Sequence, residues 1–166
     1  MQSKFLFPSL ILILLLCSYC KQKDQSSSRV NSAVSASAEI LKLHQLQRDY
    51  HFNKNVNDFV GILSDDYINV SEGVINHPTT EANTARFTSY FSSVDFQKWD
   101  DIEPPIIRFS EDSTLAYTIV HKQVELTTKD STGTEVKESV EYAWLAIYRR
   151  VGDGWKIECA VSTDKG

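Results

Sequence analysis

The histidines are the first residues to consider for chemistry, because a neutral imidazole can act as a base near physiological pH. The chain has four of them. His121 lies in the segment from Leu115 to Gln123, which alternates as a strand does. We expect His121 to be a structural residue or to lie at the rim of a site, with a base inside a pocket as the alternative.

The other titratable residues predict neither a metal site nor an acid pair. His44 and His51 have only Asp49 near them at ligand spacing, so we expect no metal site. Asp65 and Asp66 lie between a helical and an extended pattern, which favours turn capping over an acid pair. The sequence has no Gly-rich phosphate loop, Ser-His-Asp arrangement or Cys-x-x-Cys pair. We therefore expect no cofactor.

Aromatic residues in the second half of the chain are candidates for the wall of a cavity. They are Trp99, Tyr142, Trp144 and Tyr148. Large aromatic residues in strands also form plain core, which is the alternative. Asp100, Asp101 and Glu103 precede a Pro-Pro pair, and this spacing predicts a solvated acidic loop.

The first twenty residues resemble a bacterial lipoprotein signal. An apolar run from Phe5 to Leu16 is shorter than the roughly 20 residues that span a bilayer, as is typical of a secretory signal. Cys20 follows it and is the expected site of lipidation, with Cys17 as the alternative. An ordinary secretory signal is the alternative for the whole segment. We expect a lipid-anchored protein of the bacterial cell envelope, on its periplasmic or outer-membrane face.

Composition divides the remaining chain into a flexible polar tether, residues 21–37, and a single domain, residues 38–166. The formal net charge is −5 without a basic patch, which argues against nucleic acid as a partner and against contact with the membrane other than through the lipid anchor. Cys159 is the one cysteine left after cleavage at Cys20, so no internal disulfide is expected.

Hydrophobic periodicity predicts three helices followed by strands. Helical spacing covers residues 39–52, 56–63 and 79–91, with an extended segment at 65–73. Five more extended segments follow, at 96–102, 106–110, 114–129, 136–150 and 155–163. Their linkers are too short for crossovers, which predicts antiparallel pairing. Because two of these strands exceed the usual length, we expect a strongly curved sheet in an α+β fold.

Particular segments carry a resemblance over residues 38 to 163. They are Leu-Ser-Asp-Asp at 63–66, Leu-Ala-Tyr at 115–117 and Tyr-Arg-Arg-x-Gly-Asp-Gly-Trp-Lys-Ile at 148–157. The chain resembles the NTF2-like superfamily, especially its DUF4440 or SnoaL-like bacterial branch. This resemblance implies a cone of three N-terminal helices packed on a strongly curved antiparallel sheet, with a pocket and often a homodimer. The terminal hairpin is then scaffold, with Trp155 closing the sheet.

The same resemblance indicates which pocket positions could carry chemistry. Ketosteroid isomerases of this superfamily use a helix tyrosine and a late-strand acid as oxyanion donors, and a carboxylate as base. These roles fall on Gln47, on Ala146, and on Ser71 or Glu72. Because two of the three roles lack their side chains, an isomerase mechanism is not expected.

The resemblance also implies that the strand face with His121 points into the cone. The expected pocket residues are Gln47, Trp99, Tyr117, Ile119, His121, Tyr142, Trp144 and Ala146. We expect a non-catalytic domain that binds a small apolar molecule or a partner protein. One alternative is an isomerase or dehydratase that uses His121 or Glu72, and another is a dimeric interaction module.

Overall fold

The computed structural model describes residues 33–165, and the chain divides into two units at residue 38. The predicted signal, with Cys17 and Cys20, lies outside the described residues. Residues 33–37 were assigned to the tether because alanine and serine are common in tethers. They are helical, since alanine also has the strongest helix propensity. Within residues 33–165, no helix is long and apolar enough to cross a membrane.

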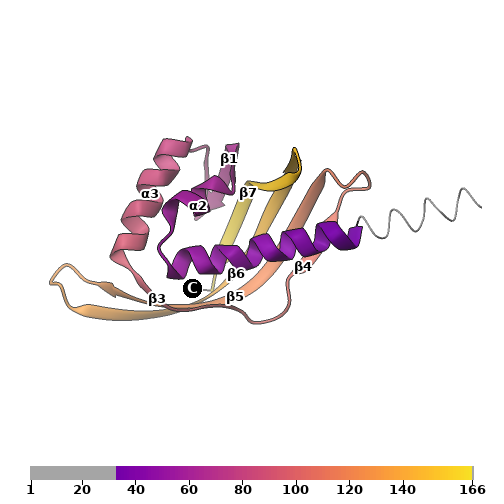
Figure 1. The fold of residues 1–166 in the computed structure, drawn as a ribbon. Coiled ribbons are helices and arrows are strands. Elements are labelled where there is room, and N and C mark those ends of the chain that lie inside the picture. Colours follow the sequence, from indigo (N-terminus) through magenta and orange to yellow (C-terminus); the bar gives the residue numbers. More distant parts are fainter. Residues whose placement is uncertain (1–32, 166) are drawn as a thin grey trace, which may run out of the picture. The chain divides into compact units, whose positions relative to one another are not determined.

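Three helices are described within residues 33–93 (Figure 1). The first covers residues 33–52, and it is followed by α2 (Val56–Gly61) and α3 (Thr80–Ser93). Side-chain caps start the two shorter helices: Asn55 accepts a hydrogen bond from the amide of Asp58, and Thr79 accepts one from that of Ala82. The prediction of three helices is confirmed, although α2 ends earlier than expected.

Seven strands form one sheet in the order β2-β1-β7-β6-β5-β3, with β4 also paired to β5. The strands are β1 (Leu63–Ser71), β2 (Val74–Asn76), β3 (Asp95–Asp101), β4 (Ile106–Phe109), β5 (Leu115–Lys129), β6 (Glu135–Val151) and β7 (Gly154–Asp164). The curved α+β plan is confirmed. One pairing differs from the expected antiparallel sheet: β1 and β7 are parallel, because the rest of the domain connects them.

The start of β1 also differs from the prediction. Asp65 and Asp66 are exposed residues of the strand itself, and the turn comes later, at Glu72 and Gly73. Both turn residues have positive φ, +52° and +76°. This turn leads into β2, a three-residue strand that the sequence did not predict.

Alternate side chains of β5 are buried against the rest of the domain. Thr118, Val120 and Lys122 are buried, whereas Tyr117 and Ile119 are 39% and 42% exposed. The predicted inward face of β5 is therefore wrong by one residue. Alternation shows which residues share a face but not which face is covered, and a shift of one residue exchanges the two faces.

The hairpin that joins β6 to β7 packs into the core through Trp155. Gly152 adopts a φ of +59° in the turn, and Trp155 beyond it is 7% exposed. The indole Nε1 of Trp155 donates a hydrogen bond to Glu39 at 3.1 Å, and its ring lies 5.9 Å from that of Phe109. This residue therefore connects the end of the sheet to the first helix.

Candidate functional site

A cavity of about 140 Å³ lies among the first helix, α2 and strands β1, β3, β6 and β7. Much of its wall is aromatic or aliphatic, including Phe59, Trp99, Trp144 and Ala146. The polar side chains in the lining are Gln47, His51, Tyr67, Asn69 and Ser162. The lining contains no carboxylate, lysine or arginine, so the cavity offers hydrogen bonds but no formal charge.

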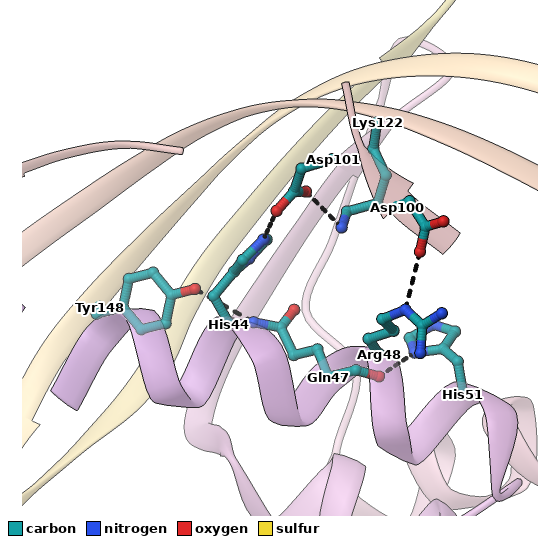
Figure 2. Close-up of polar contacts among 8 residues, drawn as sticks. All are labelled: His44, Gln47, Arg48, His51, Asp100, Asp101, Lys122 and Tyr148. Atoms are coloured by element: carbon teal, nitrogen blue, oxygen red, sulfur yellow. Dashed lines mark hydrogen bonds and ion pairs between the residues drawn. The ribbon is translucent and has the colours of Figure 1, made fainter. Parts of the chain in front are cut away.

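His51 is held in a defined tautomer by the helix that carries it (Figure 2). Its Nδ1 lies 2.6 Å from the backbone oxygen of Gln47, one turn earlier. A carbonyl only accepts hydrogen bonds, so Nδ1 carries the proton and Nε2 carries a lone pair. Burial lowers the pKa of His51 to about 4, and the imidazole is therefore neutral at physiological pH.

Aromatic rings surround His51 and fix its orientation. The ring of Trp99 is stacked on it at 4.6 Å, with an interplanar angle of 26°. Phe59 approaches edge-on at 4.9 Å. Because His51 is buried against these rings, its imidazole has little freedom to turn.

Gln47 connects the first helix to the inner face of β6. Its Nε2 donates a hydrogen bond to the hydroxyl of Tyr148 at 3.2 Å, as Figure 2 shows. Tyr148 is fully buried, and burial raises the pKa of its hydroxyl. The amide of Gln47 and the hydroxyl of Tyr148 are therefore neutral hydrogen-bonding groups in the interior of the domain.

An ion pair between a buried lysine and a more exposed carboxylate lies beside Trp99, outside the cavity lining. Lys122 is 2% exposed, and its Nζ lies 2.5 Å from Oδ1 of Asp101. The other carboxylate oxygen of Asp101 lies 2.8 Å from Nε2 of His44 (Figure 2). The ammonium group also lies 3.7 Å from the centroid of Trp99, a cation–π contact.

The pKa values of Lys122 and Asp101 both lie below their ordinary values, for different physical reasons. Burial lowers the pKa of Lys122, and Asp101 opposes this shift. Burial alone would raise the pKa of Asp101, but the hydrogen bonds from His44 and Lys122 outweigh it and lower the pKa.

Glu103 lies in an exposed loop, as predicted, whereas Asp100 and Asp101 belong to β3 and are held in ion pairs. Asp100 is bound by Arg48 at 2.9 Å.

Comparisons of the sequence found neither a matching family model nor a matching curated protein. Solved structures do match. An NTF2-like protein with a cystatin-like fold from Novosphingobium aromaticivorans is 13% identical, with a TM-score of 0.59, and the match covers 82% of this chain and 85% of that one. The chain has the NTF2-like fold.

Two further neighbours of this NTF2-like chain show how varied such proteins are. A ketosteroid isomerase-like protein from Erwinia carotovora is 14% identical, with a TM-score of 0.56 and coverage of 80% of this chain and 92% of that one. A candidate Ca/calmodulin-dependent kinase II association domain from Exiguobacterium sibiricum is 14% identical, with a TM-score of 0.63 and coverage of 78% and 93%. At these identities, the likeness concerns the fold alone.

Four of the predicted pocket residues do line the cavity of this NTF2-like domain: Gln47, Trp99, Trp144 and Ala146. Tyr142 lies close by, since its ring centroid is 5.7 Å from that of Trp144, but it is not part of the lining.

The other predicted residues lie elsewhere. Tyr117, Ile119 and His121 are on the outer face of β5, where Nε2 of His121 lies 3.7 Å from Glu141. Glu72 is exposed in the turn between β1 and β2. Neither of the two alternative catalytic residues reaches the cavity. Within residues 33–165, no group of three or more histidine, cysteine or acidic side chains is placed to hold a metal ion.

The sequence prediction missed His51 as a cavity residue. A signal for it was present, because His51 follows Gln47 by four positions and residues four apart share one face of a helix. Tyr67 and Asn69 were also missed. They alternate along β1 with residues of the opposite face, and only the position of the helices shows which set is inside.

Proposed function

We propose that this NTF2-like domain binds a small uncharged molecule in the cavity without converting it. The observation that carries this proposal is the lining: rings and aliphatic groups with a few neutral polar side chains and no formal charge. The volume of about 140 Å³ is close to the roughly 150 Å³ of an engineered apolar cavity that binds benzene. A molecule of about one ring fits this space.

The same lining argues against proton-transfer catalysis. An isomerase of this fold needs a base and donors for an oxyanion, whereas the corresponding positions here hold the amide Gln47 and the methyl group of Ala146. His51 is the one imidazole in the lining. Since burial lowers its pKa to about 4, it is a weak base at neutral pH.

The proposal includes a location. Cys20 would carry lipid and hold the domain at the bacterial cell envelope, since each buried methylene of a lipid chain contributes about 0.8 kcal/mol to membrane binding. This cysteine lies outside the described residues, so its sequence context is the support for the assignment.

A pair of variants on one strand tests ligand binding. Ala146→Leu would place a larger side chain in the cavity, and Ala143→Leu makes the same change on the exposed face of β6. Mass spectrometry of small molecules released from each purified protein, with titrations followed by tryptophan fluorescence, measures binding. We expect Ala146→Leu to lose bound molecules and Ala143→Leu to keep them, while both variants stay folded by circular dichroism.

Two results would contradict the proposal. Equal binding by both variants would place the ligand elsewhere, and chemical turnover of a bound molecule would make the domain an enzyme.

A second candidate function is self-association through the outer face of the sheet. Ile106 of β4 pairs with Ile119 of β5, and these residues are 46% and 42% exposed. Tyr117, at 39% exposure, extends this apolar surface. The candidate association domain among the structural neighbours supports a role of this class. The occupant would be a second copy of the chain.

Light scattering of the purified domain tests self-association. We expect a dimer mass that falls to the monomer mass in Ile119→Lys. The control is Ile75→Lys in β2, an exposed isoleucine outside this surface, which should leave the mass unchanged. A monomeric wild-type domain would exclude this candidate.

A further inference from the structure

We infer that the cavity takes a flat, uncharged molecule with one O–H or N–H group, such as a phenol, and that Nε2 of His51 accepts its hydrogen. This inference rests on the proposed function and names the chemical class of the ligand. Four features of the described residues support it: the tautomer of His51, the unpartnered Nε2, the rings around it and the charges near the cavity.

The tautomer of His51 is fixed by the helix backbone. The hydrogen bond from Nδ1 to the backbone oxygen of Gln47, at 2.6 Å, leaves the lone pair of the ring on Nε2. Nδ1 is turned toward the helix backbone, so Nε2 points away from that carbonyl. His51 therefore offers an acceptor, not a donor.

The acceptor has no partner in the described part of the chain. His51 makes the Nδ1 hydrogen bond and several ring contacts, but none of its hydrogen bonds within residues 33–165 involves Nε2. The residue is 7% exposed and belongs to the cavity lining. Nε2 is not one of the fully buried side-chain atoms that lack a partner, so a ligand O–H or N–H group in the cavity can reach it and donate a hydrogen bond.

The shape of the wall favours a flat molecule. Trp99 lies stacked on His51, and the centroid of Trp144 is 5.4 Å from that of Trp99. An aromatic ring in the cavity would contact the side chains of Trp99, Trp144 and Phe59, which line it. Offset and edge-on contacts between rings contribute beyond the burial of area alone.

The charges around the cavity exclude ions of both signs. A carboxylate would meet the lone pair of Nε2 and would have no arginine or lysine in the lining. An ammonium ion would find no carboxylate there, and the Lys122 ammonium group already lies 3.7 Å from the Trp99 ring. Burying an unpaired ion is costly, so the ligand is neutral.

Four one-ring probes separate these contributions: phenol, toluene, benzoate and benzylamine, titrated at pH 7 by calorimetry and tryptophan fluorescence. Phenol and toluene differ by a hydroxyl in place of a methyl group. We expect phenol to bind roughly 3- to 10-fold more tightly than toluene, as one hydrogen bond provides, and the two ions not to bind. His51→Phe should remove the preference for phenol and keep toluene binding.

Nitrogen NMR of His51 in the wild-type protein gives a readout that does not need the variant to fold. We expect the Nε2 resonance of a neutral acceptor, shifted by phenol and unchanged by toluene. Equal binding of phenol and toluene, or tight binding of benzoate, would overturn this inference and leave the proposed function intact. Absence of binding by all four probes, together with absence of any co-purified molecule, would overturn the proposed function itself.

Discussion

Asp101 and Lys122 are direct partners in the pairing of β3 with β5, and Oδ1 of Asp101 lies 2.5 Å from Nζ of Lys122. His44 of the first helix binds the second carboxylate oxygen. The ammonium group is shielded from solvent and lies over Trp99, so Asp101 is the group that compensates its charge. The contact joins the helix to the sheet beside the cavity.

Removing the carboxylate should destabilise the domain. Asp101→Ala leaves the ammonium group of Lys122 buried and unpaired, which typically costs about 3 to 5 kcal/mol. We expect a loss toward the lower end of that range, because the side chain of Asp101 is 25% exposed. Urea denaturation followed by circular dichroism measures the free energy of unfolding.

The double variant Asp101→Ala, Lys122→Met is the control for that cost. It removes both charges while the methionine still fills the space beside Trp99, so we expect it to be more stable than Asp101→Ala alone. If the double variant were less stable, hydrogen bonds to the carboxylate, and not the unpaired charge, would dominate the loss.

Acidification should destabilise the domain through His51. Its pKa in the folded state, about 4, lies below the ordinary 6.5, so the unfolded chain takes up this proton first as the pH falls. The stability that this neutral imidazole provides is complete above pH 6.5 and is lost between pH 6.5 and 4. The expected total loss is about 3 kcal/mol, measured by denaturant unfolding at several pH values.

A variant of His51 checks the assignment of that loss. His51→Phe should flatten the dependence of stability on pH between 6.5 and 5. The lowered pKa of Asp101 acts in a different window, since its contribution is present above its unfolded value near 3.8 and is lost below that value. A pH dependence that persists in His51→Phe would contradict the assignment.

Truncation of Trp155 should weaken the terminal hairpin. Trp155→Ala removes a buried ring and the hydrogen bond to Glu39, and large aromatic residues replaced by alanine typically cost about 3 to 5 kcal/mol. Trp155→Phe keeps a ring and should lose less. Thermal unfolding monitored by circular dichroism distinguishes the two variants, and a Trp155→Ala protein that melts like the wild type would show that the hairpin is not part of the core.

Membrane attachment should depend on a single cysteine. We expect Cys20→Ser to move the protein from the membrane fraction to the soluble fraction with the domain still folded, because lipid on that residue is the proposed anchor. Cys17→Ser is the matched control and should remain in the membrane fraction. Release by Cys17→Ser instead would identify Cys17 as the acylated residue.

Local patterns in the sequence were sufficient for the elements and their order. Apolar spacing located the three helices, and Gly152 marked the turn that leads to Trp155. These features depend on neighbours a few residues apart, whose periodicity and turn preferences act within the element itself. The fold class followed from the order of the elements.

The tertiary structure alone decided which faces became the site. Alternation along β5 left two choices, and the helices cover the side with Lys122, not the side with His121. His44 and Asp101 are 57 positions apart, and their contact forms only when the helix lies across β3. The physical reason is that burial, and with it the charge state of His51 and the pairing of Lys122, depends on contacts between distant segments, which no local pattern encodes.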